Sequence, residues 1–86
     1  MVTLEKLKIY KTFNGDIDSW ARLSSKKQLS AMEDSDWALI DSLMSTIIIV
    51  RRGYASDEIV NTMDTKLSQN CDSEETIILL KKMAKL

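Results

Sequence analysis

The 86-residue chain contains no histidine and no proline, and it has only two glycines and one cysteine. Histidine is the commonest general base and catalytic metal ligand, so its absence excludes a Ser–His or Cys–His nucleophile pair within the chain. The two glycines lie 38 residues apart, which leaves no glycine-rich loop to bind a phosphate. We therefore expect a protein that is not an enzyme, with no cofactor and no metal site.

A single cysteine, Cys71, excludes an internal disulfide and favours a reducing compartment. The longest unbroken apolar run, Ile47–Val50, is far shorter than the roughly 20 residues that span a bilayer. No apolar segment typical of a secretory signal follows Met1. These features predict a cytoplasmic protein without a membrane partner.

The absence of proline removes the commonest helix breaker and favours an all-α chain. The hydrophobic fraction of 44% and the charged fraction of 29% are typical of a globular protein and not of a disordered one. No segment rich in glycine or proline divides the chain. We expect one domain, residues 1–86, that forms a compact bundle of four to five helices.

The most strongly patterned stretch, Ser35 to Arg52, predicts a central helix at about residues 36–52 around which the bundle is organised. Its apolar residues occupy about half of the helical wheel, as in a helix packed by several neighbours: Trp37, Leu39, Ile40, Leu43, Met44, Ile47, Ile48 and Val50. Ser35 or Asp36 is the expected N-cap, and Gly53 the expected stop. The β-branched run Thr46–Val50 also suits a strand, but no second strand-like run exists to pair with it.

Other segments also show helical spacing, with residues 16–34 left open as one helix, two short helices or a loop. The expected starts are Thr3, Asp16, Ser25, Ser56, and either Asp72 or Ser73. The expected apolar faces are Leu4, Leu7, Tyr10 and Phe13; Ile17, Trp20, Ala21 and Leu23; Leu29 and Met32; Ile59, Val60, Met63 and Leu67; and Ile77, Leu79, Leu80, Met83 and Ala84, with Leu86 as a further candidate.

Two short patterns resemble a metal site and a reactive thiol, but each resemblance is weak. The Asp16–Ile17–Asp18 stretch resembles the start of a calcium loop, but Lys27 occupies the position of the required bidentate acid, so both aspartates are interpreted as helix-start charges. Cys71 lies near an expected helix start, which lowers a thiol pKa, although a buried, unreactive thiol is the favoured interpretation.

A helix-turn-helix-like segment at residues 16–32 provides an alternative function, DNA binding. Its polar residues Arg22, Lys26, Lys27 and Gln28 are candidates for contacts with phosphates or bases. The segment lacks the turn glycine, and the whole chain has a net charge of −1. Nucleic acid is therefore a less favoured partner than protein.

Two isoleucines lie on otherwise polar helix faces. On the helical wheel, Ile49 falls between Ser42, Ser45 and Arg52, and Ile78 falls among charged residues of the last helix. Two such β-branched residues in a small domain suggest a contact surface. We therefore expect a small protein-interaction module, such as a regulator, an adaptor or an immunity-type protein, that binds another protein or forms a homodimer through Ile49 and Ile78.

Overall fold

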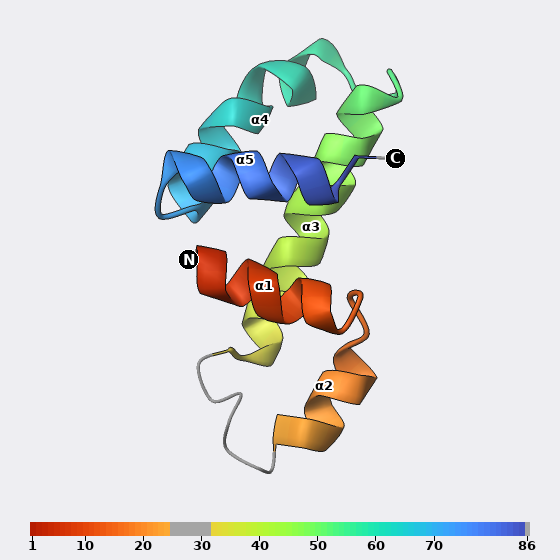
Figure 1. Cartoon of the computed structure of the whole chain (residues 1–86). Helices are drawn as coiled ribbons and strands as arrows, with labels where there is room; N and C mark the ends of the chain where they lie inside the picture. Colours follow the sequence, from red (N-terminus) through yellow and green to blue (C-terminus); the bar gives the residue numbers. More distant parts are fainter. Residues whose placement is uncertain (25–31, 86) are drawn as a thin grey trace.

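The structure is a computed structural model that describes residues 1–24 and 32–85, and these residues form an all-α bundle (Figure 1). The five helices of the described chain are α1 (Leu4–Thr12), α2 (Ile17–Ser24), α3 (Asp34–Arg51), α4 (Asp57–Asn70) and α5 (Glu74–Met83). The predicted fold class is thus confirmed. The segment Thr46–Val50 lies within α3, and Val2 and Cys71 form only an isolated parallel bridge, so the strand interpretation is excluded.

Helix α3 is the axis of the arrangement. In Figure 1, α1 and α5 cross it at different heights, α2 lies towards its start, and α4 follows its end. The predicted second short turn, from Ser25, lies outside the described residues except for Met32, which is buried. Leu86 lies outside them as well.

Side-chain oxygens cap most helix starts, as the sequence predicts. Thr3 Oγ1 accepts the N–H of Lys6 at 3.2 Å, and Ser56 Oγ accepts the N–H of Ile59 at 3.3 Å. Ser73, one of the two anticipated residues, caps α5, and Asp16 accepts the N–H of Ser19. Each bond satisfies a backbone donor that has no partner within the helix.

The expected cap of α3 is wrong. The N-cap is Glu33 instead of Ser35 or Asp36, and α3 begins at Asp34. Asp36 is the third helical residue, and its Oδ2 accepts the N–H of Glu33 at 2.8 Å. Its other oxygen, Oδ1, accepts from Lys6 Nζ of α1 at 2.9 Å. The carboxylate therefore stabilises the helix start from inside the first turn.

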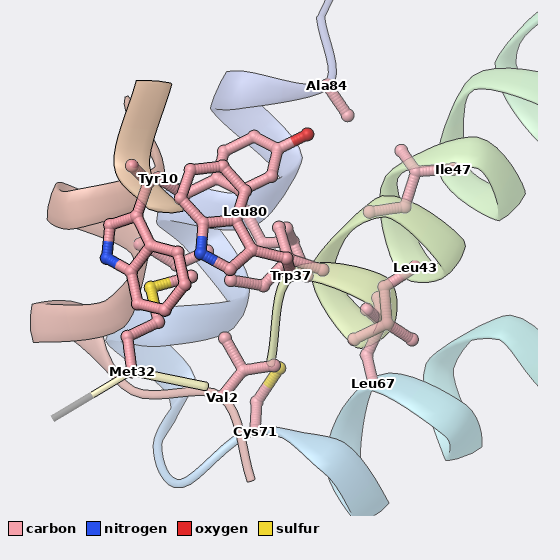
Figure 2. Packing of buried hydrophobic residues seen from close by; sticks show 13 residues of the cluster. Val2, Tyr10, Met32, Trp37, Leu43, Ile47, Leu67, Cys71, Leu80 and Ala84 are labelled. Carbon is pink, nitrogen blue, oxygen red and sulfur yellow. The ribbon is translucent and has the colours of Figure 1, made fainter. Parts of the chain in front are cut away.

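The core lies along one side of α3 (Figure 2). Leu43 and Ile47 are buried, whereas Ser42 and Ser45 are exposed, which confirms the predicted faces. The ring of Trp37 packs against three other aromatic rings, at centroid distances of 4.8 Å from Tyr10, 6.5 Å from Phe13 and 5.8 Å from Trp20. Both tryptophans thus anchor the core, because aromatic rings contribute large buried areas.

The smaller helices bury less than their apolar patterns predict. In α2, Trp20 is buried, but Ile17, Ala21 and Leu23 are exposed. In α4 the apolar stripe is buried only at its end: Leu67 is 1% exposed, whereas Ile59 and Val60 are each 43% exposed. In α5, Leu80 and Ala84 are buried, and Ile77, Leu79 and Met83 are partly buried. The first half of α4 lies beyond the crossing with α5, so its stripe lacks a covering helix there (Figure 1).

Candidate functional site

The end of α3 places two exposed apolar residues next to each other. Gly53 has φ +76°, the Gly53 N–H donates to the carbonyl of Val50 at 3.1 Å, and the Tyr54 N–H donates to the carbonyl of Ile49 at 3.2 Å. This pair of bonds defines a Schellman motif, in which the residue after the glycine contacts the residue three before the cap. Tyr54 therefore lies beside Ile49, yet their exposed fractions are 79% and 42%.

The start of α4 adds two more apolar side chains to the same end of the molecule. Ser56 is the N-cap, so Ala55 and Val60 occupy the two positions of a hydrophobic staple. Ile59 and Val60 remain exposed on the first turn of α4. We call Ile49, Tyr54, Ile59 and Val60 the α3–α4 corner. Half of the eight large hydrophobic side chains that are exposed in the described chain belong to it, and such concentration distinguishes a contact surface from scattered apolar residues.

Four charged residues lie between the members of the α3–α4 corner along the chain. Arg51 and Arg52 lie between Ile49 and Tyr54, Asp57 and Glu58 lie between Tyr54 and Ile59, and all four are exposed. Among the described residues, the ion pairs are Lys6–Asp36 and Lys81–Asp64, so none of these four charges has a partner there. The connection between α3 and α4 therefore carries exposed apolar side chains and, between them along the chain, two positive and two negative charges.

The two isoleucines predicted to bind a partner are both exposed, on different helices. Ile49 belongs to the α3–α4 corner, and Ile78 lies on α5. Ile78 is two residues before the buried Leu80, so it points about 200° away from the core side of α5. Its neighbours one turn away on α5 are charged, and it lies on a different helix from Ile49. The partner-binding role of both residues stays a prediction.

Of the residues proposed to contact nucleic acid, only Arg22 lies in the described chain. It is exposed near the end of α2, and its Nε donates to the carbonyl of Asp18 at 3.3 Å. Lys26, Lys27 and Gln28 lie outside the described residues. DNA binding by residues 16–32 therefore stays a prediction. The side chain of Arg22 bonds to the backbone of its own helix, and this contact does not favour an interaction with nucleic acid.

A surface pocket of about 280 Å³ lies between α1, α3 and α5. Its lining residues are Tyr10, Lys11, Asn14, Met44 and Met83. Burial, together with the hydrogen bond that its hydroxyl donates to Asp41, raises the pKa of Tyr10 to about 12. The hydroxyl is therefore a protonated donor at neutral pH. The pocket is smaller than most ligand sites, which measure about 300–1,000 Å³, and is a weaker candidate than the α3–α4 corner.

The cysteine does not have the lowered pKa that its position in the sequence suggested. Cys71 is buried at the end of α4, and this burial raises the pKa of its thiol, with a smaller contribution from the charge of Asp72. The interpretation as a buried, protonated thiol is thus the one supported. Within the described ranges, no group of three His, Cys, Asp or Glu side chains is arranged to hold a metal ion.

Sequence reasoning missed Tyr54 and assigned Ile59 and Val60 to the core. The signal for Tyr54 was present, because a helix-stopping glycine implies a contact between the next residue and the preceding turn. The exposure of Ile59 and Val60 had no local signal, since it depends on where α5 crosses α4.

No protein-family model matches the chain, and no curated protein or solved structure matches it either. No helix in the part of the chain that the structure describes is both long enough and apolar enough to cross a membrane. Function is therefore inferred from the surface of the bundle itself.

Proposed function

We propose that the chain is a small, non-enzymatic protein-interaction module of the cytoplasm, of the size of a regulator, adaptor or immunity-type protein, that binds through the α3–α4 corner. The observation that carries this proposal is the exposure of Ile49, Tyr54, Ile59 and Val60, which lie on either side of and within the short connection between α3 and α4. Neither α3 nor α4 covers them, because both helices extend past the rest of the bundle at this end (Figure 1).

The energetics of the α3–α4 corner favour binding. Burial of one large apolar side chain is worth about 1.5–3 kcal/mol. Tyrosine is enriched at interface centres, because it supplies a large contact area with few rotatable bonds. Tyr54 makes no side-chain hydrogen bond within the described chain, so its hydroxyl is available to a partner.

The titratable groups also support a role without catalysis. The pKa values of Tyr10 and Cys71 are both raised, so neither residue supplies an anionic nucleophile or base near neutral pH. Arg51, Arg52, Asp57 and Glu58 are exposed to solvent and do not line the pocket between α1, α3 and α5.

Photo-cross-linking tests the proposal. A photoreactive phenylalanine analogue replaces Tyr54 in one variant and Ser42 in a control, because Ser42 is exposed on the same helix as Ile49, two turns earlier. Irradiation in the native host should give a protein adduct from position 54 and none from position 42. No adduct from position 54, or equal adducts from both positions, would contradict the proposed function.

A further inference from the structure

The two residues before α1 lie against the connection between α4 and α5, and we call Met1 and Val2 the N-terminal strap. The Val2 N–H donates to the carbonyl of Asn70 at 2.6 Å, and the Asp72 N–H donates to the carbonyl of Val2 at 3.1 Å. Val2 and Cys71 form the parallel bridge between these two bonds, and their side chains lie next to each other in Figure 2. Their exposed fractions are 1% and 6%. Val2 therefore helps to shield the thiol from solvent.

The N-terminal strap has few attachments within the described chain. Besides the two backbone bonds of Val2, the carbonyl of Met1 accepts a hydrogen bond from Lys6 Nζ at 3.0 Å, and the same ammonium bonds to Asp36 on α3. Met1 itself is 63% exposed, so the strap buries one side chain. Segments with so few buried contacts open at a lower free energy than the whole domain unfolds.

Thr3 separates the strap from α1. Its backbone is extended, with φ −125° and ψ 164°, and its Oγ1 accepts the N–H of Lys6 at 3.2 Å. Its carbonyl accepts the N–H of Leu7 at 3.0 Å. Both bonds lie on the helix side of Thr3, so α1 keeps its cap when the strap moves. Rotation about the backbone of Thr3 is therefore sufficient to release the strap.

We infer that the N-terminal strap opens about Thr3 while the helices of the described chain stay folded, and that this movement controls access to the Cys71 thiol. In the closed state, Val2 covers the thiol and pairs with the backbone groups of Asn70 and Asp72. In the open state, the thiol and these two groups are exposed to solvent. The device goes beyond the proposed function and is independent of it. Lys6 ties the strap to the first turn of α3, whereas the α3–α4 corner lies at the other end of that helix.

The rate at which Cys71 reacts with an aromatic disulfide reagent tests the inference. The Cys71 thiolate attacks the disulfide of the reagent, forms a mixed disulfide and releases an aromatic thiolate, whose absorbance is measured. While the rate is proportional to the concentration of reagent, it reports the fraction of molecules in which the thiol is exposed.

Two variants that each remove buried apolar atoms separate strap opening from global unfolding. Val2→Ala shortens the one buried side chain of the strap, so the rate should rise about tenfold. Ile47→Val removes one methylene from the core in the second half of α3 and should leave the rate within about twofold of the wild type. If the thiol reacted only in the unfolded chain, both variants would accelerate the reaction, because both lower the free energy of unfolding.

A second measurement uses the wild type alone, and it decides the question if Val2→Ala fails to fold by circular dichroism. Opening of the strap exposes little surface, so the rate should hardly change with urea below the unfolding transition. A rate that follows the full slope of the unfolding curve at every urea concentration would overturn the inference. So would a folded Val2→Ala variant that reacts at the wild-type rate, or an Ile47→Val variant that reacts as fast as Val2→Ala.

Discussion

The ammonium group of Lys6 lies 2.9 Å from the carboxylate of Asp36, a contact that joins α1 to the first turn of α3. The same carboxylate accepts the N–H of Glu33 at 2.8 Å. Burial acts to raise the pKa of Asp36, but the Glu33 N–H and the Lys6 ammonium outweigh it, so the pKa lies below its usual value. The carboxylate is thus held in its charged form.

This contact predicts a specific pH dependence. Because the pKa of Asp36 is lower in the folded than in the unfolded chain, its contribution is present above the unfolded pKa and is lost as pH falls through the folded pKa. Asp36→Asn should lower the free energy of unfolding by about 1–3 kcal/mol at neutral pH. Urea unfolding at several pH values should show this difference shrinking in acid. A difference that is constant with pH would contradict the assignment.

The two faces of α3 predict opposite results for neighbouring substitutions. Leu43→Ala and Ile47→Ala should each destabilise the protein by about 2–5 kcal/mol, because each leaves a cavity in the core. Ser42→Ala and Ser45→Ala, on the exposed face, should change stability by less than about 0.5 kcal/mol. Chemical denaturation measures all four, and serine variants as costly as the aliphatic ones would show that the faces are misassigned.

Substitution of the two glycines by alanine should lower the free energy of unfolding by different amounts. Both have positive φ, +75° at Gly15 and +76° at Gly53, so alanine is strained at each. An added Cβ at Gly15 would lie 2.8 Å from the hydroxyl oxygen of Tyr10, whereas no atom lies within 4 Å of one at Gly53. Gly53→Ala should cost about 1–2 kcal/mol, and Gly15→Ala about 1 kcal/mol or more beyond that.

A double-mutant cycle isolates the cause of the extra cost at Gly15. In the Tyr10→Phe background, which lacks the hydroxyl, Gly15→Ala should cost less than it does in the wild type. Equal costs of Gly15→Ala and Gly53→Ala in the wild type would show that the close approach of Tyr10 has no energetic effect.

The raised pKa of Tyr10 predicts that the stability of the protein falls at alkaline pH. Its pKa is raised from 10.0 to about 12, first by burial and then by the hydrogen bond to Asp41. The resulting stability is complete below the unfolded pKa of 10.0 and is lost as pH rises towards about 12. The stability advantage of the wild type over Tyr10→Phe should therefore shrink across this range. Urea unfolding of both proteins measures it, and an advantage that is unchanged would contradict the raised pKa.

Most helices could be predicted because their determinants are local. Thr3 and Ser56 cap helices by bonds to residues three positions later, and Asn14 and Gly15 end α1 with positive φ. The buried face of α3 follows from the spacing of its own apolar residues. All these features depend on residues within about one turn of each other.

The errors arose where a distant element decides the result. The acidic stretch before α3 offers several possible caps, and Asp36 differs from the others through Lys6, 30 residues earlier in the chain. The stripe of α4 has regular spacing, yet its burial depends on the position of α5, so Leu67 is buried and Ile59 is not. The α3–α4 corner was predicted only through Ile49, because a helical wheel does not extend to Tyr54 in the connection.

The central claim, that the chain binds another protein through the α3–α4 corner, is tested most directly by amide chemical shifts measured by NMR while the protein recovered in the position-54 adduct is added. We expect the amides of residues 49–60 to shift along one binding curve, while those of α1 and the buried half of α3 stay constant. The Tyr54→Ser variant should lose these shifts and keep its fold. Shifts that are absent at every concentration, or that are centred on Ile78 of α5, would contradict the claim.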